Sequence, residues 1–344
     1  MSSSALDVRS VLRQAWHLRR ESDHRGMIAL LSDLPHGTLT RNLELAHLLS
    51  WGLREAGEFR KSLDLQLELE PLFRARGNDW LLRAWLLVAT GNHMFIGDIA
   101  QAREDSLECL DLASRVDDQY AIAWATNNLA AADAYTGRSS EALINLQRAA
   151  AANHKRGYLR GLALAFHNLG GVYCDLTDYK EALSNIQQAT EYSRQIGDPL
   201  LLLWHDVARA EALLGLRDTE LAVAILHPAE TAFARAEMRF QQVNALLQLG
   251  VCTRLQGEPM TARGFLTRAL KLSRDAGAEL LSALVHIQLG LVSDASGDTQ
   301  GAITSAGEAH QLLSRFGSTF YLDRNIEEFS SEVRAHLLRL TTAK

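Results

Sequence analysis

The chain has 344 residues, a hydrophobic content of 47% and a formal net charge of −6. This charge argues against general nucleic-acid binding, which needs a basic surface, and the absence of any apolar run of about 18 residues excludes a membrane-spanning helix. Only 5 prolines occur, while Ala, Leu, Glu and Arg are abundant, and this composition favours helix throughout.

The three cysteines are typical of a reducing compartment. Cys109, Cys174 and Cys252 have no CxxC spacing and fall within predicted helices, so a disulfide framework is not expected. The N-terminus lacks the long apolar core of a signal peptide. We therefore expect a cytoplasmic protein.

Residues 1–40 are predicted to form a helical cap at the N-terminal end. Two segments between residues 5 and 34 have apolar residues at helical spacing, but they are out of register with the repeat that follows. The first segment contains Val8, Val11, Leu12, Ala15, Trp16 and Leu18, and the second contains Met27, Ile28, Leu30 and Leu31.

A 40-residue repeat then occurs seven times between residues 41 and 322, without insertion or deletion. When the copies are aligned, two columns of equivalent positions hold mainly small residues. The first column contains Ser62, Ala102, Ala142, Ala182, Ala222, Ala262 and Ala302. The second contains Leu69, Cys109, Ala149, Ala189, Ala229, Ala269 and Ala309. Small residues let two helices approach closely, so Leu69 predicts a looser or differently packed first copy. Such repeats are supersecondary units that share one continuous core.

Each copy is predicted to be a pair of helices, here called A and B. In the copy from Ala163 to Leu202, the apolar residues at helical spacing are Phe166, Leu169, Val172 and Tyr173 in helix A, and Tyr179, Ala182, Leu183, Ile186, Ala189 and Tyr192 in helix B. Thr177-Asp178 separates the two helices, and Gly197-Asp198-Pro199 ends helix B.

The same turns recur in the other copies. The A–B turns contain Gly57, Gly97, Gly137, Thr177, Arg217, Gly257 and Gly297, and the B–A turns contain Gly77, Asp117, Gly157, Gly197, Glu237, Gly277 and Gly317. An acidic residue follows the A–B turn position in every copy except the third, where Arg138 stands. We expect these acidic residues to cap helix B, because a carboxylate accepts hydrogen bonds from free N–H groups at a helix start.

Residues 323–344 are predicted to cap the other end of the solenoid. The apolar spacing indicates one amphipathic helix from Tyr321 to Leu340, which would cover the last exposed repeat face. Its apolar residues are Leu322, Ile326, Phe329, Val333, Leu337 and Leu338.

The repeat resembles the tetratricopeptide repeat (TPR) in its helix-A glycine (Gly170, Gly250, Gly290), its Gly-Asp turn and its alanine columns. The 40-residue length is similar to that of Pins/LGN-type scaffolds, bacterial TPR peptide receptors and the sensor regions of maltose-regulator-like transcription factors. The resemblance implies an all-α, right-handed superhelical solenoid of about seven TPR helix pairs with helical caps at both ends. The fifth copy, which begins at Leu203, departs most from the pattern.

The resemblance also implies a concave groove lined by the A helices. Primary amides there can grip the backbone of an extended peptide, because each amide both donates and accepts hydrogen bonds, and apolar residues can anchor side chains. The residues predicted to bind a peptide or partner are Trp124, Asn127, Asn128, Leu164, His167, Asn168, Trp204 and Gln248. The alternative is that the amides are solvated and the tryptophans only fill gaps between copies. Gly91, Ala131 and Gly171 leave room in the groove.

The sequence contains no phosphate loop, HExxH motif, nucleophile elbow or Cys/His cluster with metal spacing. His47 and His167 fall at groove positions three copies apart, without evident carboxylate or thiol partners. We therefore expect no enzyme activity, no cofactor and no metal site. The groove positions hold no lysine, which argues against a clamp for a C-terminal carboxylate.

These observations predict a non-catalytic module that binds an extended peptide or a partner helix in its concave groove, with no direct nucleic-acid or membrane partner. The alternative is the ligand-sensing TPR region of a bacterial transcription regulator or signalling enzyme. A third hypothesis is an assembly protein that self-associates through its end helices or its unusual fifth copy.

Overall fold

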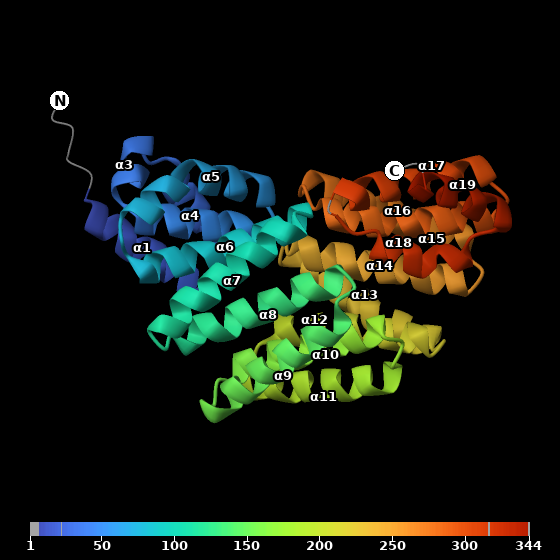
Figure 1. The fold of residues 1–344 in the computed structure, drawn as a ribbon, viewed down its shortest axis with the longest axis horizontal. Coiled ribbons are helices and arrows are strands. Elements are labelled where there is room, and N and C mark those ends of the chain that lie inside the picture. The colour runs from blue at the N-terminus through green and yellow to red at the C-terminus, as the bar shows by residue number, and fades with distance from the viewer. Residues whose placement is uncertain (1–6, 22, 316, 343–344) are drawn as a thin grey trace.

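The computed structural model describes residues 7–21, 23–315 and 317–342, and this part of the chain is helical and contains no β-strand (Figure 1). Three helices form the N-terminal end, and they are α1 (Val8–Arg20), α2 (His24–Ser32) and α3 (His36–Arg41). The first two lie where two helices are predicted, although residues 5 and 6 of that prediction lie outside the described residues. The short helix α3 was not predicted.

Seven A–B pairs follow, as predicted. They are α4 (Leu43–Glu55) with α5 (Phe59–Ala75), α6 (Asp79–Ile96) with α7 (Ile99–Arg115), α8 (Gln119–Tyr135) with α9 (Ser139–Lys155), α10 (Leu159–Asp175) with α11 (Tyr179–Ile196), α12 (Pro199–Gly215) with α13 (Thr219–Arg235), α14 (Arg239–Leu255) with α15 (Pro259–Asp275), and α16 (Glu279–Ala295) with α17 (Thr299–Arg315).

Every turn position predicted from the two glycine columns has a left-handed backbone. This includes the four positions where the column holds another residue, and these are Asp117 (φ 53°), Thr177 (φ 61°), Arg217 (φ 66°) and Glu237 (φ 55°). Left-handed residues commonly end helices, because the next N–H groups can then bond the last free carbonyls. The turn geometry therefore belongs to the repeat itself and does not depend on glycine at each site.

The prediction that an acidic residue caps each B helix is confirmed where that residue is aspartate and wrong where it is glutamate. The carboxylates of Asp98, Asp178, Asp218 and Asp298 each accept a hydrogen bond from the backbone N–H three residues later. Glu58 and Glu258 make no such bond. A glutamate side chain is one methylene longer, and the Glu58 carboxylate instead forms ion pairs with basic side chains.

Helices A and B of a pair pack closely, as the alanine columns predict. Ala182 and Ala189 have 0% of their surface exposed. A Cβ atom added at Gly170 would lie 2.5 Å from Ile186 Cγ1, and one at Gly250 would lie 2.5 Å from Leu266 Cγ. These contacts leave no room for a side chain at either glycine, because interiors are packed to crystal-like density.

The C-terminal end differs from the prediction of one helix from Tyr321 to Leu340. It consists of α18 (Phe320–Asn325), the 3-10 turn η1 (Ile326–Glu328) and α19 (Ser331–Thr342). Phe329 is extended at the break, and Ser330 donates through both its N–H and its hydroxyl to the Asp294 carboxylate. The predicted apolar stripe is still used, because Phe329 and Val333 are buried in the cluster of α16 and α17.

The solenoid also closes on itself, a contact that no pattern in the sequence indicates. Phe59 of α5 and Ile96 of α6 share one apolar cluster with Val243 of α14 and Val285 of α16. Helix α6 therefore meets α16, and also α14 through the rings of Phe95 and Phe240, near the other end of the chain (Figure 1). We call this contact between α5–α6 and α14–α16 the closing contact.

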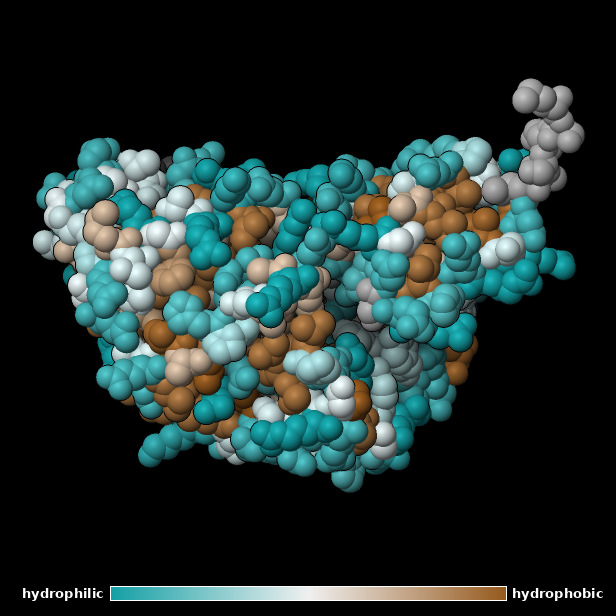
Figure 2. All heavy atoms as spheres, turned by 180° about the vertical axis from the view of Figure 1, so that it is seen from behind, coloured by the Kyte–Doolittle hydropathy of each residue, from teal (hydrophilic) through white to brown (hydrophobic). Residues whose placement is uncertain are grey.

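None of the helices in the described ranges is long and apolar enough to cross a bilayer. On the face shown in Figure 2, apolar residues appear in separate patches with hydrophilic residues between them. All three cysteines are buried and unpaired, and burial raises the pKa of the Cys109 and Cys252 thiols to about 12.

Candidate functional site

The predicted binding residues lie on four successive A helices, each of which contacts the next. Trp124, Asn127 and Asn128 are on α8, Leu164, His167 and Asn168 are on α10, Trp204 is on α12 and Gln248 is on α14. Because the A helices of neighbouring pairs stack side by side, residues 40 positions apart fall on one surface.

Three of these residues meet in one apolar cluster. Trp124 and Trp204 are half-buried, and both pack against the cluster that contains Leu164, which is 5% exposed. The buried part of this cluster, Leu164 with Ala163 and Leu201, supports the two indole rings. The partly exposed rings are the only parts of this trio that a ligand could touch in the closed solenoid.

The amides differ in how far they are satisfied. Asn127 is 4% exposed, and its Oδ1 is buried without a hydrogen-bond partner among the described residues. The side chains of Asn128, Asn168 and Gln248 are half-buried and make no hydrogen bond within the described part of the chain. A buried, unpaired amide oxygen costs about 1–3 kcal/mol, so a ligand N–H that reached it would remove that cost.

His167 connects this row of amides to the apolar cluster. Its ring lies 4.4 Å from that of Trp204, centroid to centroid, and its Nδ1 lies 3.0 Å from Nδ1 of His205. A Cβ atom added at Gly171, one helical turn further along α10, would meet nothing within 4 Å. Space is therefore open beside His167, as the sequence predicts for Gly171.

A second polar cluster, which sequence reasoning missed, joins α18 to the middle repeats. Arg324 donates to the Asp175 carboxylate and to the carbonyl of Cys174, while the Tyr321 ring packs 5.9 Å from that of Tyr135. Burial raises the pKa of the Asp175 carboxyl to about 6, although Arg324 opposes it. Burial and the nearby Asp175 raise the pKa of the Glu211 carboxyl to about 7.

This cluster gives a pH-dependent prediction for Glu211→Gln. The folded protein binds the Glu211 proton more tightly than the unfolded chain does, so this group increasingly destabilises the fold as pH rises from about 4.5 to about 7. We expect the variant to have a free energy of unfolding about 2 kcal/mol higher than wild type at pH 8, and less than about 1 kcal/mol higher at pH 5. Urea denaturation at both pH values measures this. Glu220→Gln, at an exposed glutamate, is the control. If Glu211→Gln raised the free energy of unfolding equally at both pH values, the prediction would be contradicted.

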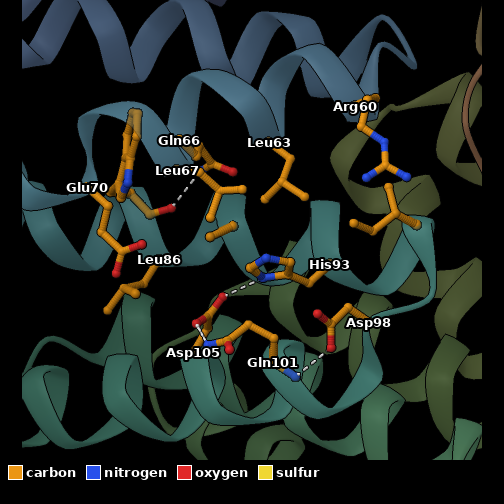
Figure 3. Close-up of a pocket in the computed structure, with 13 residues that line it drawn as sticks. Arg60, Leu63, Gln66, Leu67, Glu70, Leu86, His93, Asp98, Gln101 and Asp105 are labelled. Carbon is orange, nitrogen blue, oxygen red and sulfur yellow. Dashed lines mark hydrogen bonds and ion pairs between the residues drawn. The ribbon is translucent and has the colours of Figure 1, made fainter. Parts of the chain in front are cut away.

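Two cavities lie elsewhere, and no predicted site residue lines either of them. One, of about 470 Å³, lies between helix α5 of the first copy and helices α6 and α7 of the second (Figure 3). In it, Nδ1 of His93 lies 2.8 Å from the Asp105 carboxylate. The other, of about 230 Å³, lies between α1, α4 and the start of α6. No group of three or more His, Cys, Asp or Glu residues that could hold a metal occurs within the described ranges.

Comparison with solved structures shows this fold in other helical-repeat proteins. A Rap protein in complex with the competence and sporulation factor aligns over 97% of this chain and 96% of its own, at 17% identity and a TM-score of 0.68. NprR in complex with its cognate peptide NprX aligns over 88% and 89%, at 14% identity and a TM-score of 0.54. A STAND protein with a TPR sensor from Pyrococcus horikoshii aligns over 95% of this chain and 48% of its own, at 16% identity and a TM-score of 0.51.

No protein-family model matches the sequence, and no curated protein matches it. The structural likenesses confirm the predicted all-α solenoid of TPR type, and the fold is similar to that of Rap and NprR over nearly the whole chain.

Proposed function

We propose that the chain is a non-catalytic module that binds an extended peptide along the A helices α8, α10, α12 and α14. The observation that carries this proposal is the row of half-buried amides without partners, Asn128 and Asn168, next to the unpaired Oδ1 of Asn127. Two similar folds support it, because the Rap protein was solved with the competence and sporulation factor and NprR with the peptide NprX.

The amides and the indole rings would have separate roles in binding. Each amide offers one acceptor and two donor hydrogens, which suit the N–H and C=O groups of a peptide backbone whatever its side chains. Trp124 and Trp204 would contact one or two apolar side chains, and such aromatic anchors often dominate the binding free energy. Because stacked helices hold both sets in place, little ordering entropy is lost by the protein on binding.

The test is capture of a random library of twelve-residue peptides by the immobilised full chain. The double substitution Asn128→Ala and Asn168→Ala should lower the recovery of bound peptides at least about tenfold, since each lost hydrogen bond costs about 1 kcal/mol. Helix content measured by circular dichroism should not change. The matched control removes two exposed amides of a B helix, Gln187→Ala and Gln188→Ala, and should not affect recovery. Equal recovery by all three proteins would exclude the amide row.

A regulatory sensor is the second candidate, and the closing contact favours it. If the closing contact can open, the solenoid has a closed and an open arrangement, and a ligand that prefers one of them shifts the population. The output would then be read by a signalling partner, either on the same polypeptide or in trans. Small-angle scattering with and without a peptide selected from the library checks this, and an unchanged profile would argue against a sensor.

A further inference from the structure

We propose that Ser193, His205 and His167 form a hydrogen-bond relay that presents Nε2 of His167 to the groove as an uncharged group able to donate or accept. By this relay the groove would favour neutral amide groups over carboxylates at His167. The inference rests on the proposed peptide-binding function and adds two residues, Ser193 and His205, as positioning residues.

The relay crosses three helices. The hydroxyl of Ser193 on α11 lies 2.7 Å from Nε2 of His205 on α12, and Nδ1 of His205 lies 3.0 Å from Nδ1 of His167 on α10. Ser193 and His205 are 0% exposed, whereas His167 is half-buried. Nε2 of His167 makes no hydrogen bond within the described ranges and is not among their buried unpaired atoms. This nitrogen therefore reaches the surface beside Trp204 and the open space at Gly171.

The contact between the two Nδ1 atoms allows two arrangements of protons. A neutral imidazole has one donor and one acceptor nitrogen, so one ring must donate to the other. If His205 donates, its Nε2 accepts from the Ser193 hydroxyl, and Nε2 of His167 carries a hydrogen and faces the groove as a donor. If His167 donates, Nε2 of His205 donates to the Ser193 oxygen, and Nε2 of His167 is an acceptor. Both arrangements contain the same protons and satisfy every interior nitrogen.

The environment keeps both rings neutral. Burial lowers the pKa of His205 to about 4, against a smaller opposing effect of Asp198. Burial and the facing His205 lower the pKa of His167 well below its usual value. At neutral pH a ligand carboxylate would thus gain no ion pair at His167 and would lose water. A peptide amide could be met by either proton arrangement.

The repeat pattern indicates that the relay is not needed for packing. In the column of His205 the other copies hold only apolar residues, and these are Leu45, Trp85, Ala125, Ala165, Ala245 and Val285. The same place between helices can therefore be filled without hydrogen bonds. A buried polar chain here, next to the row of amides, is more easily explained by a role in the groove.

The first experiment needs no peptide. ¹⁵N NMR of the histidine rings in the full chain should show, at pH 7, one protonated and one bare Nδ1 for the pair His167 and His205, and neither ring should titrate near pH 6.5. Ser193→Ala should shift the tautomer of His167 toward the Nε2–H form, because His205 then has no acceptor at its buried end. The matched control is Ser273→Ala, which removes the equivalent buried hydroxyl two copies on. Two rings that titrate independently near pH 6.5 would overturn the relay.

The second experiment uses two small probes, N-methylacetamide and acetate, at equal concentration. We expect the amide to change the ¹⁵N chemical shift of His167 Nε2 at least about threefold more than acetate does. A difference of about threefold corresponds to the free energy of one net hydrogen bond. An equal or larger response to acetate would overturn the selectivity. The same measurement in the Asn128→Ala, Asn168→Ala protein should give the same ratio, so failure of the amide row and failure of the relay are distinguishable.

Discussion

Replacing Phe95 by aspartate should open the closed solenoid and expand the protein in solution. The Phe95 ring lies 4.3 Å from Phe59 of α5 and 4.3 Å from Phe240 of α14, centroid to centroid. Phe95 is half-buried, so a carboxylate at this position would lose both ring contacts and would be partly desolvated beside an apolar cluster, which is unfavourable. We expect the radius of gyration from small-angle scattering to rise above the value of about 20 Å typical of a compact chain of this length.

The apolar rings should matter more than the ion pairs around them. Arg60 with Glu279 and Arg239 with Glu58 bridge the same contact, at 3.0 Å and 3.7 Å. Pairs this exposed contribute about 0–1 kcal/mol each and are weakened by salt. The wild-type scattering profile should therefore hardly change in high salt. Trp80→Asp, at a tryptophan of α6 that is 48% exposed, is the control. If the scattering profile of Phe95→Asp were identical to those of the wild type and Trp80→Asp, the rings would not be what holds the closing contact together.

The local fold could be predicted because each 40-residue copy repeats the same short-range information. The glycine columns predict the turns, and the backbone is left-handed even at Thr177 and Arg217, where glycine is missing. The alanine columns predict the A–B contact, and Ala182 and Ala189 are fully buried. Aspartate and glutamate could not be distinguished from charge alone, because the difference at Glu58 depends on side-chain length.

The closing contact could not be predicted, because it depends on the superhelical path as a whole. Small rotations add up over the copies between α6 and α16, and no pattern in the sequence states their sum. Phe95 and Phe240 are 145 positions apart and belong to different columns of the repeat. The break at Ser330 is similar, because its partner Asp294 lies in another helix.

Part of the candidate site did have a usable signal. His205 stands in a column where the other copies are apolar, and Ser193 lies 12 residues before it, at the facing position of helix B. A polar residue in an apolar column needs a buried partner, so this pair could have been found from the repeat alignment. The Asp175–Arg324 contact had no such signal, since it joins α18 to a helix 149 positions earlier.

Replacing Ala189 by leucine should cause a large loss of stability. Ala189 is 0% exposed on α11, and the same contact between α10 and α11 has no room for even one carbon at Gly170, beside Ile186. Three extra carbon atoms in such a contact cost about 3 kcal/mol or more, because helices A and B must separate. The midpoint of urea denaturation should fall accordingly. Ala151→Leu, at an exposed alanine of α9, is the control and should change the midpoint little.

Leu69 provides the reciprocal test in the same column. It is 1% exposed and packs with Phe73 and Trp85, in the copy beside the cavity of about 470 Å³. Here the larger side chain is part of the core, so Leu69→Ala should itself cost about 2–5 kcal/mol by leaving a void. If the column only required a small residue, Leu69→Ala would be neutral or stabilising. If Ala189→Leu and Leu69→Ala both destabilise the protein, each copy has its own spacing between helices A and B. Leu69 then sets a wider spacing in the first copy.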